Sequence, residues 1–355
     1  MNKKLKVLYQ IPSLNTLYAG RTIYNGYKNG FLKLGHQFRP LTADDNLEKV
    51  IDEYKPDIMM TSLSKFNLKY LDLDIYNKAR KNGMVSMIFA PYWSYPFSDF
   101  RINEDKGLSD DKELIKKIKD GLMGDIFYHP ADHEDPRMQG FEEGTGYKYH
   151  TVLLAADDSI VPQRDERFNS DILFLGTNLP EKRDFFKRNV LSYRNKYKVM
   201  LLGQDWTFFD RLTGWVQRGG QYFNIPILKN FKKPKYKLQD EANMYFTSKI
   251  SVNVHEEYQR ISGGCCNERT YKIPLYGGFE IVDNVRCIKD QFEVGKEIIL
   301  AENEEDWNQK MEYYLKNSDK RIEIIKAGQE RIKKSHTYVN RANQLIKLYK
   351  DFKKI

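Results

Sequence analysis

The sequence lacks long hydrophobic runs. No stretch of about 18 consecutive apolar residues is present, so no segment has the length of a transmembrane helix. The N-terminus, MNKKLKVLYQIPSL, begins with basic residues but has neither the apolar core nor the small-residue cleavage site of a signal peptide. We therefore expect a cytoplasmic protein with no membrane span.

Cysteine and histidine are also scarce. The three cysteines, Cys265, Cys266 and Cys287, are too few for a disulfide framework, and two adjacent cysteines without a second pair or a nearby histidine make a poor zinc site. We expect reduced, structural thiols. Because the six histidines are scattered along the chain, we predict no metal site and no cofactor.

Positive charge, by contrast, is in excess: 58 Lys and Arg residues against 49 Asp and Glu give a formal charge of +9. Such an excess can attract phosphate-rich partners, whether nucleic acid, an anionic membrane face or a nucleotide-sugar, or it can simply keep the surface solvated. The segment 217–237 (QRGGQYFNIPILKNFKKPKYK) is denser in basic and aromatic residues than its surroundings. It is interpreted either as a nucleic-acid or glycan surface or as a solvated loop.

The first half of the 355 residues alternates short apolar runs with helical patterns. Single helices that end at Gly, Asn-Gly or Lys-Pro separate the runs. This alternation predicts a parallel, doubly wound sheet. The predicted strands are Leu5–Ile11, Gln37–Leu41, Asp57–Ser62, Met84–Phe89, Asp125–His129 and Thr151–Ala155.

A second alternation begins after a polar linker at Asp157–Asn169. Its predicted elements are the strands Asp171–Leu175, Lys198–Leu202, Ile250–Val254 and Phe279–Val282 and the helices Pro180–Tyr193, Gln239–Ser248 and Asn267–Tyr276, with three further helices closing the chain. The fold class is therefore predicted as α/β, with two Rossmann-like, doubly wound lobes facing a cleft. The expected boundaries are 1–165, 166–335 and 336–355.

The C-terminal half carries a series of motifs. NERTYKIPLYGGF (267–279) resembles the N-x-R-x-[FY]-E-I-x-A-x-G-G signature of CgeB-like, spore-maturation-type glycosyltransferases. Further similarities follow the order of that family: DILFLGT (171–177), VMLLGQDW (199–206), SVNVH (251–255), FEVGKEIILAENEEDW (292–307) and SHTYVNRANQLI (335–346).

This resemblance implies a GT-B fold and a metal-independent transfer of a sugar from a nucleotide-sugar, UDP-linked, to an acceptor hydroxyl. Residues 1–165 would bind the acceptor and 166–335 the nucleotide-sugar. The helix within 336–355 would cross back to the N-terminal domain.

The central motif is also intelligible from its chemistry. A helix that begins near Asn267 directs free N–H groups and the positive end of its dipole toward a bound diphosphate. Arg269 can bind phosphate oxygens through two nitrogens and stabilise the charge that develops on the leaving diphosphate, which makes it one predicted catalytic residue. The alternative for Arg269 is a surface salt bridge.

Other donor-site candidates come from the remaining motifs. The Gly176-Thr177 turn can meet phosphate through its amides, and Trp206 lies where a nucleobase would rest or belongs to the core. His255 either faces the cleft or is a satisfied core histidine. The predicted donor-binding residues are Gly176, Thr177, Gly203, Trp206, His255, Asn267, Glu268, Arg269, Gly277 and Gly278.

One position departs from the signature. The residue after the aromatic is a glutamate in the family and Lys272 here. A cation cannot accept hydrogen bonds from sugar or ribose hydroxyls. Either Glu268 or Glu280 takes that role, or the donor is unusual, or the lobe is altered in function.

On the acceptor side, an inverting transfer needs a general base. Asp99, in the loop PYWSYPFSDF, is the second predicted catalytic residue, followed as candidates by His129 and His133. A retaining enzyme needs no such base. Tyr92, Trp93 and the two histidines are the predicted acceptor-binding residues.

Three functions are compatible with these observations. The leading hypothesis is a glycosyltransferase acting on a glycan, protein or small molecule. The second is a DNA-modifying glycosyltransferase acting on a hydroxymethylated base, which the net charge and the segment 217–237 motivate. The third is a catalytically altered nucleotide-binding homologue, which Lys272 motivates.

Overall fold

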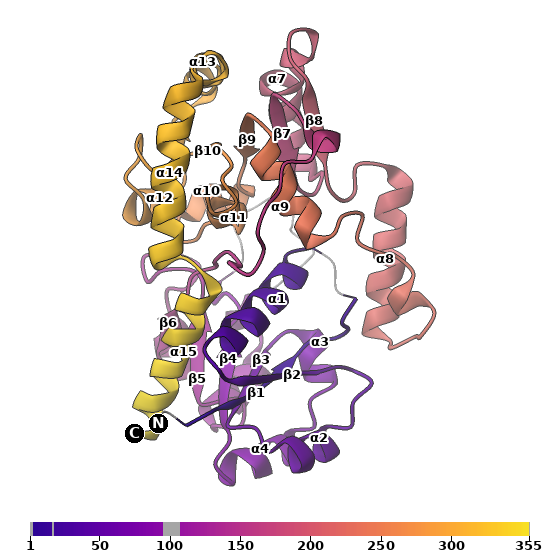
Figure 1. The fold of residues 1–355 in the computed structure, drawn as a ribbon. Coiled ribbons are helices and arrows are strands. Elements are labelled where there is room, and N and C mark those ends of the chain that lie inside the picture. The colour runs from indigo at the N-terminus through magenta and orange to yellow at the C-terminus, as the bar shows by residue number, and fades with distance from the viewer. Residues whose placement is uncertain (1–2, 16–17, 95–106, 355) are drawn as a thin grey trace. The chain divides into compact units, whose positions relative to one another are not determined.

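The computed structural model describes residues 3–15, 18–94 and 107–354 (Figure 1). The chain forms two compact units, and each contains its own parallel sheet. The unit that we call the first comprises Met1–Leu153, Val216–Lys232 and Val339–Ile355. The second unit comprises Leu154–Trp215 and Lys233–Tyr338.

The first unit is built on a six-stranded parallel sheet in the order β2-β1-β3-β4-β5-β6. The prediction of its strands is confirmed, although the last one lies earlier than expected. The strands are β1 (Lys6–Gln10), β2 (Gln37–Leu41), β3 (Ile58–Ser62), β4 (Val85–Phe89), β5 (Ile126–His129) and β6 (Tyr149–Thr151). The helices are α1 (Tyr18–Lys33), α2 (Leu47–Tyr54), α3 (Lys65–Lys69), α4 (Leu73–Lys81), α5 (Lys112–Lys119), α6 (Phe141–Thr145) and, from Val339 onward, α15 (Tyr338–Lys353).

Polar side chains fix where the helices of this unit begin. Asn46 accepts a hydrogen bond from the Lys49 amide at the start of α2, and Asp72 accepts from two amides at the start of α4. Each cap satisfies backbone N–H groups that have no partner inside the helix. The strands β3 and β4 are buried except for their last residues, which is typical of strands in a parallel sheet covered on both faces.

The second unit is built on a five-stranded parallel sheet in the order β11-β10-β9-β7-β8. Four of these strands were predicted, and β11 is an addition. The strands are β7 (Ile172–Leu175), β8 (Val199–Leu202), β9 (Ile250–Asn253), β10 (Glu280–Asp283) and β11 (Ile299–Ala301). The helices are α7 (Arg183–Asn189), α9 (Leu238–Thr247), α10 (Glu257–Ser262), α11 (Arg269–Leu275), α12 (Arg286–Gln291), α13 (Glu304–Lys316) and α14 (Ser318–Ser335).

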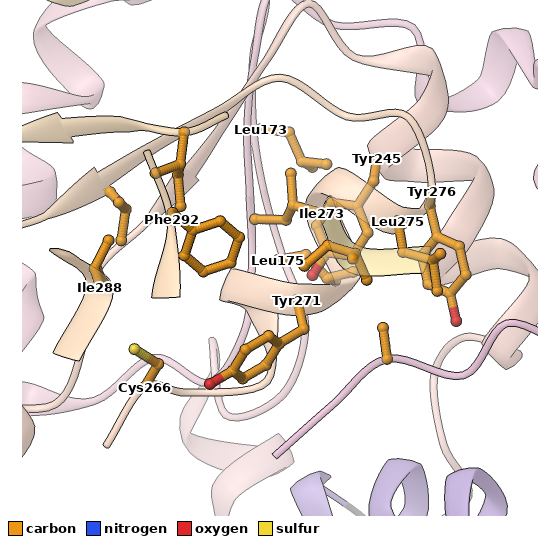
Figure 2. Packing of buried hydrophobic residues seen from close by; sticks show 14 of the residues in the cluster. Leu173, Leu175, Tyr245, Cys266, Tyr271, Ile273, Leu275, Tyr276, Ile288 and Phe292 are labelled. Atoms are coloured by element: carbon orange, nitrogen blue, oxygen red, sulfur yellow. The ribbon is translucent and has the colours of Figure 1, made fainter. Parts of the chain in front are cut away.

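Two apolar clusters cover the two faces of this sheet. On one face, Tyr271 and Ile273 of α11 pack with Tyr245 of α9 and with Leu173 of β7 (Figure 2). On the other, Phe174 of β7 packs among side chains of α7 and α13. The α/β, doubly wound architecture that the sequence predicts is therefore confirmed for both units.

Three predicted elements differ from the observed ones. The helix expected at Pro180–Tyr193 is divided into a 3-10 turn, α7 and a second 3-10 segment, and α11 is a seven-residue helix that begins two residues later than expected. The segment 217–237 is not simply a loop, because α8 (Phe208–Tyr222) extends into it. This helix belongs to the second unit as far as Trp215 and to the first unit from Val216.

Candidate donor site

The order of the strands in the second unit marks where a ligand can bind. β8 lies on one side of β7 and β9 on the other, so the chain reverses direction across the sheet between β7 and β9. In open α/β sheets such a point opens a crevice at the carboxyl ends of the strands. The residues that follow these two strands, Gly176 after β7 and Val254 after β9, therefore define the candidate site.

Arg269 reaches this point from α11. Its Nε donates to Asn253 Oδ1 at 2.9 Å and its Nη2 donates to the Val254 carbonyl at 3.1 Å. Nη1 lies beside Gly176, since a Cβ added to that glycine would be 2.8 Å from it. Nη1 has no hydrogen-bond partner among the described residues. The side chain is half-buried. Arg269 is thus held by two bonds with one nitrogen left to contact a ligand.

The fully buried amide of Asn253 holds the arginine in place. Its Oδ1 accepts from Arg269 and from Asn267 Nδ2, both at 2.9 Å. Its Nδ2 donates to Thr270 Oγ1 at 3.1 Å and to Glu280 Oε1 at 2.7 Å. All four hydrogen-bonding positions of the amide are used, so its orientation is fixed. Asn253 forms part of the SVNVH motif but was not among the predicted site residues.

Asn267 contacts the start of α11 through its side chain. Its Oδ1 accepts the backbone N–H of Arg269 at 2.9 Å, so the first amide of α11 already has a partner. A helix of seven residues also carries few aligned peptide dipoles. The positive character of the site therefore comes mainly from side chains rather than from the helix N-terminus.

Lys182, which was not among the predicted site residues, supplies a second cation. Its Nζ donates to the same Val254 carbonyl at 2.7 Å, and the side chain is 2% exposed. Burial, reinforced by the charge of Arg269, lowers the pKa of Lys182 to about 7. The sequence signal that could have predicted Lys182 is its place as a basic residue shortly after a strand and the Gly176-Thr177 turn.

The carboxyl group beside Asn253 does not neutralise these cations. Glu280 is 2% exposed, and burial raises its pKa to about 8, so it is protonated at neutral pH. Its Oε2 has no hydrogen-bond partner among the described residues. A neutral, buried Glu280 leaves the positive charge of Arg269 available for an anionic ligand.

Glycines allow the two loops at this edge to approach closely. A Cβ on Gly203, whose φ is +123°, would lie 2.2 Å from the Gly176 carbonyl oxygen. Trp206 donates from its indole nitrogen to that same oxygen at 3.1 Å and packs on Phe174 and Phe186. Trp206 thus braces the Gly176 loop as part of the core, and the half-buried Thr177 follows in that loop.

His255 is fully buried behind the site. Its Nδ1 lies 2.7 Å from Asp283 Oδ1, its backbone N–H donates to the same carboxylate, and its Nε2 lies 3.3 Å from Thr270 Oγ1. Burial lowers the pKa of His255, which favours the neutral ring with the proton on Nδ1. His255 therefore helps to orient Thr270 of α11, and its own side chain is not accessible to a ligand.

The remaining donor candidates lie in a second cluster along α11. Lys272 Nζ is 3.5 Å from Glu241 Oε2, and Glu268 accepts a hydrogen bond from Tyr338 at 3.1 Å. Burial alone would lower the pKa of Lys272, but Glu241 and Glu268 raise it to about 12, whereas burial raises the pKa of Glu268 to about 7. Lys272 is thus a buried counter-ion for two carboxyl groups.

Gly277 and Gly278 end α11. Gly277 has a φ of +74°, and a Cβ on Gly278 would lie 2.9 Å from Ile273 and 3.0 Å from the Tyr245 carbonyl oxygen. These two glycines permit the turn and the close packing of α11 on α9.

The acceptor candidates belong to the first unit, except that Asp99 lies outside the described residues. Tyr92 and His129 lie together, with ring centroids 4.4 Å apart, and Arg137 stacks on Tyr92 at 3.8 Å. His129 Nδ1 accepts the Ala131 N–H, and burial lowers the pKa of His129 to about 3. The neutral ring then carries its proton on Nε2, which can donate a hydrogen bond.

The other two acceptor candidates, Trp93 and His133, contact other residues. The Trp93 ring covers Gly140 and Gly144, where a Cβ on Gly144 would be 1.9 Å from the indole. His133 is exposed and packs beside Tyr149, with ring centroids 4.5 Å apart. Within residues 3–15, 18–94 and 107–354, no group of three or more His, Cys, Asp or Glu side chains is placed to hold a metal ion.

Part of the sequence resembles a known protein family. Residues 183–347 match a family model described as glycosyl transferase-like. No curated protein matches the sequence. Nor does any helix in the described part of the chain combine the length and apolar character that crossing a bilayer requires.

Several solved structures share the fold. A glycosyltransferase from Rickettsia africae ESF-5 has 13% identity over 98% of both chains and a TM-score of 0.59. HepE from Anabaena, in complex with UDP and glucose, has 10% identity over 97% of this chain and 99% of that chain, with a TM-score of 0.57. An alpha-glucosyltransferase in complex with UDP and DNA containing an HMU base has 10% identity over 98% of this chain and 99% of that chain, with a TM-score of 0.62. The family model thus finds residues 183–347 glycosyl transferase-like, and the similar solved structures show that the chain has their GT-B fold, built from two parallel-sheet units.

Proposed function

We propose that this chain transfers a sugar from a UDP-linked donor to an acceptor hydroxyl, and that the second unit binds the donor diphosphate. One observation carries the proposal: Arg269 and Lys182 both donate to the Val254 carbonyl at the point where the strand order reverses. Two cations on one carbonyl repel each other, and a bound diphosphate relieves that repulsion. The UDP complexes of two proteins with a similar fold support this choice of donor.

The chemistry assigns each cation a role. In the transfer, the bond between the sugar carbon and the diphosphate oxygen breaks, the acceptor oxygen bonds to that carbon, and the hydroxyl proton leaves to a base. Negative charge then collects on the leaving diphosphate. Arg269, held by Asn253 and Val254, stabilises that charge without having to reorganise, and Lys182 adds to it when protonated. Asp99 remains our candidate base for an inverting reaction.

We also propose that the chain is a CgeB-like enzyme, which the order of its motifs supports. The two side-chain cations support a reaction without a metal, so we expect turnover to persist in the presence of a chelator. We also propose that the reaction takes place in the cytoplasm.

The decisive experiment compares donor turnover in Arg269→Ala with that in Arg188→Ala, whose arginine is exposed and paired with Glu304. Arg269→Ala should reduce kcat by roughly 10²–10³-fold with a smaller change in KM, because its contact strengthens in the transition state. Arg188→Ala should behave like the wild type. Equal turnover in both variants, with UDP-glucose and the other UDP-sugars, would contradict the proposal.

Two alternatives remain distinguishable by binding measurements. An acceptor on DNA, favoured by the basic segment 217–237, requires DNA binding that weakens steeply with salt. A catalytically altered homologue, favoured by Lys272, requires tight UDP-sugar binding in calorimetry with neither donor hydrolysis nor transfer.

A further inference from the structure

The helix α8 presents its apolar side to solvent. Four large apolar side chains lie on one stripe at helical spacing and are exposed to the extent of 72%, 40%, 55% and 38%: Phe208, Leu212, Trp215 and Tyr222. The opposite stripe, which the protein covers, consists of polar residues and glycine: Asp210, Gly214, Gln217 and Gly220. A surface helix of a globular protein normally has the reverse arrangement.

Specific contacts hold the polar stripe against the protein. Gln217 donates to the Asn15 carbonyl at 3.0 Å and accepts the Lys232 N–H at 2.7 Å. A Cβ on Gly220 would lie 2.5 Å from the backbone of Leu228, so the returning chain packs directly on the helix. The outward direction of the apolar stripe is therefore fixed by the contacts on its opposite side.

The chain that follows α8 also exposes large apolar side chains. Phe223, Ile225, Ile227 and Phe231 are exposed to the extent of 65%, 40%, 81% and 54%. The backbone between them is anchored, because Lys229 forms an ion pair with Asp44 at 2.5 Å and Tyr70 donates to the Tyr222 carbonyl at 2.7 Å. An anchored backbone with exposed apolar side chains indicates a surface formed to meet a partner.

Charge identifies the partner. The segment from Phe208 to Lys237 contains seven basic residues and one acidic residue. Lys229 pairs with Asp44, Lys235 pairs with Asp210 and Lys232 is buried, whereas Arg218, Lys233 and Lys237 are exposed. A second copy of the chain would bring the same positive charge to the interface. Nucleic acid would use the basic and aromatic side chains but offers nothing to aliphatic ones such as Leu212 and Ile227. An anionic bilayer satisfies both, because its head groups attract the basic residues and its acyl boundary accepts the apolar ones.

We propose that the α8 face, meaning the exposed apolar residues of α8 and of 223–231 together with Arg211 and Arg218, binds the surface of an anionic lipid bilayer. The helix lies in the interface and does not span it. This proposal goes beyond sugar transfer and is independent of the donor site, so either can fail without the other.

The test uses the full-length protein and sedimentation with vesicles. One set contains phosphatidylglycerol and phosphatidylcholine in equal parts, and the other contains phosphatidylcholine alone. We expect the protein to sediment with the first set, more weakly at high salt, and much less with the second. The double variant Trp215→Ser, Ile227→Ser should lower partitioning at least tenfold, and Arg218→Glu should weaken binding to the anionic vesicles selectively.

Matched controls separate this face from general surface stickiness. Val161 and Ile261 are exposed apolar residues outside the face, at 73% and 58%, so Val161→Ser, Ile261→Ser should partition like the wild type. Unchanged melting temperatures show that both double variants are folded. Absence of wild-type binding to anionic vesicles, or equal loss in the control variant, overturns the proposal. So does an outcome in which the face variants abolish DNA binding or self-association while vesicle binding is unaffected.

Discussion

Replacement of Lys182 by methionine tests the electrostatics of the donor site most directly. The variant keeps the length and apolar stem of the side chain but removes the buried amine. Because the pKa of Lys182 is lowered from 10.5 to about 7, mainly by burial, the folded protein disfavours the charged amine by roughly 5 kcal/mol at pH 7. Loss of the bond to the Val254 carbonyl offsets about 1 kcal/mol of the gain. Lys182→Met should therefore be more stable by about 4 kcal/mol at pH 7.

The pH dependence follows from the direction of the shift. Below pH 7 the amine is charged in both the folded and the unfolded state, so the cost of burying the charge is present in full. Between about pH 7 and 10.5 the unfolded chain binds the extra proton, and the stability of the wild type rises with pH. The advantage of Lys182→Met should accordingly fall to about 1 kcal/mol near pH 9. Chemical denaturation at several pH values, followed by tryptophan fluorescence, measures both quantities.

The same variant should bind the donor poorly. A bound diphosphate favours the charged amine, so UDP binding by the wild type should take up a proton near neutral pH and weaken by up to about tenfold per pH unit above 7. Calorimetry in buffers of different ionisation enthalpy detects that uptake, which Lys182→Met should lose. Lys187→Met, on the exposed side of α7, is the matched control. A Lys182→Met variant that is less stable than the wild type and binds UDP with the same affinity would refute this reasoning.

Two further substitutions probe the same edge of the sheet. Gly203→Ala should cost about 2–4 kcal/mol of stability, because the new Cβ meets the Gly176 carbonyl oxygen at a φ of +123°; Gly219→Ala, which has open space around it, should not lower the melting temperature. Glu280→Gln should leave the Kd for UDP at pH 7 within about threefold, because a carboxyl group with a pKa of about 8 is already neutral there. A large rise in the Kd of that variant at pH 7 would mean that Glu280 acts as an anion.

Much of the fold was predictable because buried parallel strands leave a clear signal in the sequence. Short apolar runs separated by amphipathic helices predicted ten of the strand positions in the two sheets. β11 was missed because it is three residues long and lies inside an acidic-rich segment. α8 was only partly recognised because its apolar stripe faces outward and its packed side contains Gly214 and Gly220, so the usual periodicity of a helix that packs on a core does not apply.

The candidate site was predictable only in part, for a reason that lies in the strand order. Arg269, Asn267 and Gly176 belong to motifs that can be recognised one at a time. Asn253 and Glu280 become important only because β9 lies beside β10, and Lys182 only because the turn after β7 returns to the end of β9. Adjacency of this kind is absent from any single motif.

The charges around Lys272 explain why a cation can occupy this position. The signature has a glutamate at this position, but here Glu241 and Glu268 already lie beside it, and a third carboxyl group would add repulsion between like charges. Lys272 instead forms an ion pair with Glu241 and lowers the pKa of Glu268. The substitution is therefore part of a balanced cluster rather than an isolated loss. Glu268, with its pKa of about 7 and its hydrogen bond from Tyr338, is the carboxyl group of this cluster that we propose for contact with a hydroxyl of the donor.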